Sequence, residues 1–318
     1  MRPDDVLEII TACGLSSKDA VVTPLVGGVS CDTHAIDTPS GSWVVKQALG
    51  TLRSAELWES DPRRIVAEAA ALRWFHEISP MHVPQPFALV EEVNALVLPR
   101  AKQPSPDLRQ MLLQKPTAIG EPLGKAIGTL LAQWHQWDPS GAIGTLLDDR
   151  SRLISLRVDP FYRDMAIKWP QYGAVISQAV EELLDSSYAV IHGDFTPKNI
   201  LVVGETFWVI DPETAHIGHP VLDTASMLTH LVLKEIHHCD DEANRQSIRA
   251  FRLAFEKAIS TSLVSLPESL SIHIGTILGV RIDGRSRVPY LNDSARIRVR
   301  EVAHALLEGA AVEEVMNQ

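Results

Sequence analysis

Two polar segments near the middle of the chain carry side chains suited to one kind of chemistry. Asp194 and Asn199 stand five residues apart, and Asp211 follows seventeen residues after Asp194. Phosphoryl transfer needs such groups. One carboxylate accepts or orients the proton of the attacking hydroxyl, while an Asn and a second Asp hold Mg²⁺ against nucleotide phosphates. Magnesium prefers oxygen ligands and takes few of them from the protein. The spacing therefore indicates phosphoryl transfer, and the alternative is a chance His-Gly-Asp turn before a β-hairpin.

A buried ion pair is predicted between Lys46 and Glu68, which could position phosphates. Lys46 lies inside a strand expected over residues 43–47, which is apolar at 43–45. The helix that follows has an apolar face made of Ile65, Leu72 and Phe75. Glu68 is the one charge on that face, and a carboxylate there is costly unless it is paired. The alternative puts Lys46 on an exposed sheet edge and Glu68 in water.

The turn between the first two expected strands contains Gly27, Gly28 and Ser30. Glycines at this point allow backbone N–H groups to approach phosphates, and Ser30 adds a hydroxyl. A Gly-Gly hairpin turn without any ligand explains the same residues equally well.

Residues 192–199 match in full the pattern His-Gly-Asp-x4-Asn of the aminoglycoside phosphotransferase and choline kinase superfamily. The chain resembles this family, which implies a protein-kinase-like fold. By this resemblance Asp194 is the catalytic base, and Asn199 and Asp211 are Mg²⁺ ligands. Protein kinases have Arg where Gly193 stands and an Ala-Pro-Glu segment after the second Asp, which this chain lacks. A small-molecule kinase is therefore favoured over a protein kinase.

The same resemblance assigns further residues to the nucleotide site. It implies that Lys46, held by Glu68, positions the α- and β-phosphates of ATP. Backbone groups near Pro99 and Ala101 would read the adenine, and Pro99 can offer only its carbonyl. Asp223 would brace the catalytic loop from the following helix by accepting hydrogen bonds from backbone N–H groups.

The segment Asp211-Pro212-Glu213 departs from the Asp-Phe-Gly of protein kinases and is similar to the Asp-x-Glu of 5-methylthioribose kinases. That likeness implies that Glu213 joins the metal site, and the alternative is a solvated turn carboxylate. Methylthioribose kinases depart from the usual Asn where this chain keeps Asn199. The resemblance therefore does not assign methylthioribose as the substrate of this chain.

Two parts of the chain must position these groups. Residues 4–12 indicate a short helix, and residues 21–26, 33–36 and 43–47 predict an antiparallel meander. Asp61 is the expected N-cap of the next helix, with Pro62 at its first position. Two further strands lie near residues 87–91 and 95–98, before a proline-rich hinge at residues 99–106.

Beyond the hinge, helical periodicity dominates except for a hairpin over residues 200–203 and 206–210. Its turn, Gly204-Glu205, suits a two-residue β-hairpin. We expect an α+β, protein-kinase-like fold. A small β-rich N-lobe spans residues 1–98 and binds nucleotide, and a large, mostly helical C-lobe spans residues 99–318 and carries the catalytic and acceptor sites.

The composition of the chain disfavours some classes of binding partner and indicates the compartment. A net charge of −11 over 318 residues disfavours general binding to nucleic acid or to an anionic membrane. The three cysteines, Cys13, Cys31 and Cys239, lack CxxC spacing and suggest free thiols in a reducing compartment. No apolar run reaches the roughly 18 residues that span a bilayer. We expect a cytoplasmic protein.

The sequence thus predicts a Mg²⁺-dependent kinase that transfers the γ-phosphoryl group of ATP to a hydroxyl of a small metabolite or antibiotic. The alternative is a catalytically silent kinase-fold protein that binds nucleotide or regulates a partner. The intact set of Lys46, Glu68, Asp194, Asn199 and Asp211 argues against that alternative. The identity of the acceptor, the choice between ATP and GTP, and the formation of a homodimer stay open.

Overall fold

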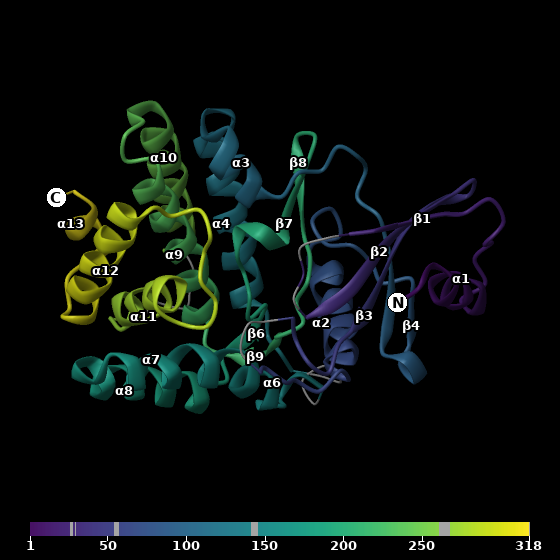
Figure 1. Ribbon diagram of the computed structural model, residues 1–318, viewed down its shortest axis with the longest axis horizontal. Coiled ribbons are helices and arrows are strands. Elements are labelled where there is room, and N and C mark those ends of the chain that lie inside the picture. Colours follow the sequence, from purple (N-terminus) through teal and green to yellow (C-terminus); the bar gives the residue numbers. More distant parts are fainter. Residues whose placement is uncertain (26–27, 29, 54–56, 141–145, 261–267, 318) are drawn as a thin grey trace.

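The computed structural model describes residues 1–25, 28, 30–53, 57–140, 146–260 and 268–317, arranged as a β-rich part and a larger helical part (Figure 1). The β-rich part is an antiparallel sheet of order β1-β2-β3-β5-β4. Its strands are β1 (Val21–Pro24), β2 (Cys31–Thr38), β3 (Gly41–Ala48), β4 (Ala88–Val90) and β5 (Ala95–Pro99). The expected meander and the two later strands are confirmed. The boundary between lobes at residues 98 and 99 stays a prediction.

The two faces of the sheet are covered by different helices, as the alternation of side chains along a strand requires. One face packs Val45 and Val97 against Ile9 and Ile10 of α1 (Pro3–Ala12) in a small core. The opposite face, with Leu96, belongs to the main core of the molecule together with α2 (Arg64–Ile78). Lys46, one residue from Val45, therefore points toward α2.

Helix α2 begins later than expected. The carboxylate of Asp61 accepts from the backbone N–H of Arg63 at 2.9 Å and from the Arg63 guanidinium at 3.1 and 2.9 Å. These bonds close a turn, so the first helical residue is Arg64 and not Pro62. The predicted start of the helix was two residues early, but the Asp61 carboxylate still accepts the backbone N–H bond that an N-cap residue accepts, at the turn that leads into α2.

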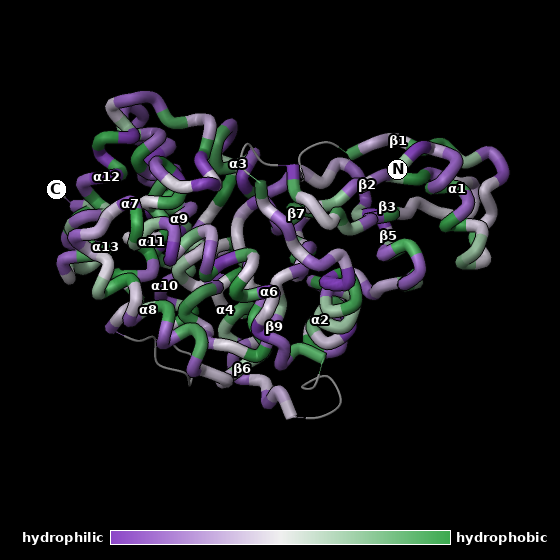
Figure 2. Tube along the Cα trace, turned by 60° about the horizontal axis from the view of Figure 1, so that its bottom comes forward, coloured by the Kyte–Doolittle hydropathy of each residue, from purple (hydrophilic) through white to green (hydrophobic). Residues whose placement is uncertain are grey.

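Helices form most of the second part, and its core is continuous with α2. Phe75 of α2 stacks on Trp134 with ring centroids 4.0 Å apart, and hydrophobic segments gather along α2 and α4 (Figure 2). The helices here are α3 (Leu108–Gln114), α4 (Glu121–Gln136), α6 (Ser151–Leu153), a π-helical segment (Ile154–Arg163), α7 (Asp164–Lys168), α8 (Gly173–Asp185), α9 (Val221–His237), α10 (Glu242–Ile259), α11 (Leu270–Ile282), α12 (Asp293–Leu307) and α13 (Val312–Met316).

Two short two-stranded sheets interrupt the helices. The expected one, β7 (Ile200–Val203) with β8 (Thr206–Val209), is confirmed with its two-residue turn. The other pairs β6 (Ala189–Ile191) with β9 (His216–Gly218), and the sequence did not indicate it. The loop of Asp194 follows β6, and Asp211 follows β8, so these two strand pairs position both polar segments. Within the described residues, no helix is both long and apolar enough to cross a bilayer.

Candidate active site

The loop between β6 and β7 carries Asp194 and is held by side chains on both sides. Asp223 at the start of α9 accepts hydrogen bonds from the backbone N–H groups of His192 and Gly193, each at 2.8 Å. The side-chain amide of Asn199 donates to the backbone carbonyl and to Oδ2 of Asp194 at 2.9 and 3.1 Å. The predicted bracing role of Asp223 is therefore confirmed.

His192 and Gly193 serve the shape of this loop. His192 accepts from the backbone N–H of Asp194 through Nδ1 at 3.2 Å, and its Nε2 lies 3.0 Å from the carbonyl oxygen of Ile210. Burial lowers the pKa of His192, which favours the neutral ring with its proton on Nε2. Gly193 has φ +76°, and a Cβ there would lie 2.6 Å from the carbonyl oxygen of Thr214. A larger residue, such as the Arg of protein kinases, does not fit this backbone.

Asp194 is buried and surrounded by cations. Arg157 from the π-helical segment lies 2.9 Å from Oδ1, and Lys198 lies 2.9 Å from Oδ2. Burial alone would raise the pKa of Asp194, but Arg157 and Lys198 outweigh it and hold the pKa below the ordinary value. The carboxylate is thus ionised at neutral pH and can accept a hydrogen bond from a hydroxyl. Neither cation was predicted from the sequence.

The ion pair predicted from the sequence is present. Lys46 Nζ lies 2.8 and 2.9 Å from the two carboxylate oxygens of Glu68, and it also contacts Asp211. Burial would lower the pKa of Lys46, but Asp211 and the neighbouring carboxylates raise it well above its ordinary value. Burial raises the pKa of Glu68 to about 7, with Lys46 acting in the opposite direction. The ammonium therefore stays charged between two carboxylates.

Asn199 and Asp211 come from adjacent ends of the β7–β8 hairpin. The backbone N–H of Ile210 donates to the carbonyl of Asn199 at 2.9 Å, which sets Asp211 beside Asn199. The hydrogen bonds to Asp194 use the side-chain nitrogen of Asn199 and not its side-chain oxygen. One amide oxygen and one carboxylate fit the few oxygen ligands that Mg²⁺ takes from protein when phosphates supply others. Within the described part of the chain, no group of three or more His, Cys, Asp or Glu residues is placed to hold a metal.

Glu213 is buried, so the alternative of a solvated turn carboxylate was wrong. Its Oε2 accepts from Arg64 Nε at 3.0 Å, and Arg64 also donates to the carbonyls of Ser30 and Leu49 at 2.5 and 2.9 Å. Burial would raise the pKa of Glu213, but Lys46 and Arg64 lower it. Arg64, which the sequence did not single out, thus ties Ser30 and Leu49 to Glu213 in the segment after β8. A metal contact by Glu213 stays a prediction.

Two cavities meet at these residues. The smaller, about 400 Å³, lies between the sheet and the hinge, and Lys46, Glu68, Pro99 and Ala101 line it. The larger, about 600 Å³, extends into the helical part past Asp194 and Glu213. Both are lined by Gly28, Ser30, Lys198 and Asp211. The predicted nucleotide-site residues thus surround one space, except Gly27, which lies outside the described residues.

The sequence matches the phosphotransferase enzyme family over residues 21–256. The chain belongs to this family. No curated protein matches this phosphotransferase. A solved putative aminoglycoside phosphotransferase from Ralstonia eutropha JMP134 is 15% identical, with a TM-score of 0.57 over 96% of this chain and 97% of that one.

Two other solved structures extend the likeness in fold. A choline/ethanolamine kinase family protein from Mesorhizobium loti is 13% identical, with a TM-score of 0.54 over 100% of this chain and 98% of that one. A spectinomycin phosphotransferase, solved with ADP and spectinomycin, is 14% identical, with a TM-score of 0.52 over 100% of this chain and 97% of that one. The expected protein-kinase-like fold of this phosphotransferase is confirmed.

Proposed function

We propose that this phosphotransferase is a Mg²⁺-dependent kinase that transfers the γ-phosphoryl group of ATP to a hydroxyl of a small molecule. The observation that carries the proposal is the convergence of Lys46, Asp211 and Asp194 where the two cavities meet. A donor in one cavity and an acceptor in the other would face each other across this junction. The names of the solved relatives, which include a choline kinase and a spectinomycin phosphotransferase with ADP, support the same class of reaction.

The smaller cavity suits the nucleotide. Backbone groups of Pro99 and Ala101 would read the adenine, and Lys46, fixed by Glu68, would hold the α- and β-phosphates. Gly28 and Ser30 line the end nearest Asp211. Asn199 and Asp211 would hold Mg²⁺, with Glu213 nearby, and the ion would neutralise charge on the phosphates.

Asp194 would orient the attacking hydroxyl. An ionised carboxylate with a lowered pKa is a weak base, so its main effect is to hold the hydroxyl by a hydrogen bond and to accept the proton as transfer proceeds. Lys198 lines both cavities, so its ammonium would stabilise the charge that moves from donor to acceptor. No side chain needs to carry the phosphoryl group, so transfer is direct and in line.

The test is an ATP-consumption screen of the purified protein with Mg²⁺ against hydroxylated metabolites and antibiotics, with Asp194→Ala as the blank. We expect turnover with at least one acceptor and a loss of about 10²–10⁴-fold in the variant, with nucleotide binding kept. Near-normal activity of Asp194→Ala would reject the role of that residue. Nucleotide binding without consumption across the panel would favour the silent, regulatory alternative.

Three free cysteines and the proposed use of ATP support a cytoplasmic location for the protein.

A further inference from the structure

The helical end of the larger cavity is rich in cations. Six basic side chains line the cavity: Arg109, Arg157, Lys198, Lys234, Arg281 and Arg287. Its acidic lining residues are Asp194, Asp211 and Glu213, which already pair with Arg157 and Lys198, with Lys46, and with Arg64. The acceptor end of the cavity therefore has more positive than negative charge, although the whole chain is acidic.

Arg281 of α11 is nearly buried and has no carboxylate partner among the described residues. Its Nη1 donates to the carbonyl and hydroxyl oxygens of Ser286 at 3.2 and 2.5 Å, while its Nε is buried without a hydrogen-bond partner. The guanidinium lies 5.1 Å from the ring centroid of Phe161. Burial lowers the pKa of Arg281 to about 10, so the side chain stays cationic at neutral pH.

Lys234 of α9 is fully buried in similar surroundings. Its Nζ lies 3.3 Å from Nδ1 of His230 and 3.1 Å from the hydroxyl of Tyr290. No ion pair joins Lys234 to a carboxylate of the described residues. Burial and the neighbouring Arg281 lower the pKa of Lys234 well below its ordinary value. A lysine kept in such a place is costly for the folded protein.

Other buried cations of the same chain do have carboxylate partners. Arg252 pairs with Glu235 at 2.8 Å and with Glu256 and Glu313 at 2.9 Å each. Arg64, which holds Glu213, likewise has a carboxylate partner. These structural cations form direct ion pairs, whereas Arg281 and Lys234 form none with the described residues. Asp194 acts on Arg281, and Asp107 on Lys234, only at longer range. The missing ion pairs point to a ligand.

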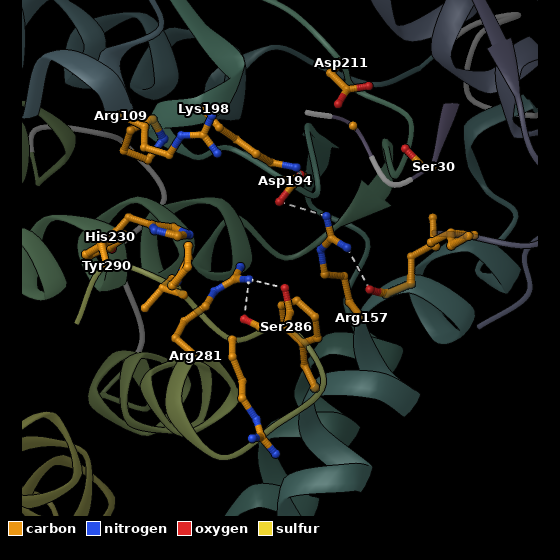
Figure 3. A pocket seen from close by; sticks show the side chains of 18 of the residues that line it. Ser30, Arg109, Arg157, Asp194, Lys198, Asp211, His230, Arg281, Ser286 and Tyr290 are labelled. Carbon is orange, nitrogen blue, oxygen red and sulfur yellow. Dashed lines mark hydrogen bonds and ion pairs between the residues drawn. The ribbon is translucent and has the colours of Figure 1, made fainter. Parts of the chain in front are cut away.

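The position of these cations fits an acceptor better than a nucleotide. Arg281, Lys234, His230 and Tyr290 line the larger cavity and are not among the residues that line the smaller one. In Figure 3, Asp194 lies between Asp211 on one side and Arg281, His230 and Tyr290 on the other. A molecule whose hydroxyl reaches Asp194 would extend toward these groups and away from the donor phosphates.

We propose that the acceptor carries a permanent anion, a phosphate or a carboxylate, and that Arg281, Lys234 and the Tyr290 hydroxyl bind this anion while the acceptor's hydroxyl lies at Asp194. The proposal rests on the kinase function proposed above and names its substrate class. Guanidinium and ammonium groups bind phosphate and carboxylate by charge-assisted hydrogen bonds. A cationic acceptor, such as an aminated sugar, would face like charge and be rejected.

Binding is tested first, without reference to turnover. The panel pairs each neutral sugar with its phosphate ester, its sugar acid and its amino sugar, and thermal unfolding reports binding. We expect phosphate esters or sugar acids to raise Tm by several degrees, and neutral and amino sugars to leave it within one degree. The phosphate and acid arms tell which anion is preferred. No anion-induced shift, or a larger shift with amino sugars, would overturn the proposal.

Variants then locate the anion. Arg281→Met and Lys234→Met should each lower the affinity for the preferred anionic sugar by about 10-fold or more, and the exposed control Arg245→Met should not. Lys234→Met keeps the side-chain length, so it is the variant expected to fold without disturbance. The shift in Tm caused by ADP checks that each variant retains its nucleotide site. Unchanged anion affinity in both variants would place the anion elsewhere and overturn the proposal.

Kinetics separate this proposal from the kinase function. Faster ATP consumption with anionic acceptors, lost mainly through a higher KM in Arg281→Met, supports both. Consumption with amino sugars or neutral sugars as the best acceptors overturns the anionic acceptor and leaves the kinase standing. Anion binding that needs Arg281, without any ATP consumption, supports the anion site and overturns the kinase.

Discussion

Two buried lysines of one active site have opposite surroundings. Lys46 lies between the carboxylates of Glu68 and Asp211, and its pKa is raised well above the ordinary value although burial opposes this. Lys234 has His230 and Tyr290 as neighbours, and burial lowers its pKa well below the ordinary value. Glu68 and Asp211 thus neutralise Lys46 at the proposed donor end. Among the described residues no carboxylate pairs with Lys234 at the proposed acceptor end, which fits an anionic ligand there.

The largest effect is expected at the donor end. Lys46→Met leaves Glu68 buried without its cation, which should cost about 3–5 kcal/mol of the free energy of unfolding. Denaturant unfolding at pH 7 measures it. The double variant Lys46→Met/Glu68→Leu should recover most of the loss, since the fully buried carboxylate is removed with its cation and the remaining partner, Asp211, is partly exposed. A loss below about 1 kcal/mol in the single variant would mean that the pair is not coupled to the fold.

A smaller effect is expected where Asp223 holds the catalytic loop. Asp223→Asn offers one acceptor oxygen to two backbone N–H groups, so one of them loses its partner, at a cost of about 1–3 kcal/mol. Turnover should fall together with stability because the same bonds position Asp194. The exposed variant Asp241→Asn, at the start of α10, serves as the control for an Asp at a helix start. Full turnover with normal stability in Asp223→Asn would show that the loop keeps its shape unaided.

The smallest effect has the opposite sign. Lys234→Met removes a buried amine that has no carboxylate, so we expect a gain of about 1–2 kcal/mol in the free energy of unfolding at pH 7. The folded pKa of Lys234 is lowered, so below about pH 10.4 the unfolded chain binds more protons than the folded chain. The wild type therefore loses stability as the pH falls from about 10.4 toward the folded pKa. The gap between variant and wild type should therefore narrow from pH 7 toward pH 10. A destabilised variant at pH 7 would show that Lys234 has an internal counter-charge, and the contrast with Lys46 would disappear.

The donor end could be predicted from the sequence because its signals are local. Asp194, Asn199 and Asp211 lie within one loop and hairpin, and Lys46 and Glu68 each break an apolar pattern. The lobes and most strands followed from periodicity and turn residues. The start of α2 did not, because the first bonds after Asp61 join residues three apart in a turn, and the α-helix begins only at Arg64.

The acceptor end could not be predicted in the same way. Arg281 and Lys234 lie 47 residues apart on different helices, and nothing in their spacing says that they share a cavity. Arg64 sits at the start of a helix, where an arginine is ordinary, and only the fold shows that it holds Glu213. The pairing of β6 with β9 joins short apolar runs 27 residues apart, counted from Ala189 to His216, which periodicity does not connect.

Helix α9 links the two ends of the proposed acceptor site. Asp223 in its first turn holds the loop of Asp194. Lys234, eleven residues later (234 − 223), lines the cavity where the anion is proposed to bind. A helix rises 1.5 Å per residue, so these points are about 16 Å apart along one rigid rod. Any shift of the sheet relative to the helices would move the donor and leave this spacing unchanged. The helix would then act as a molecular ruler that selects acceptors by the reach between their hydroxyl and their charge.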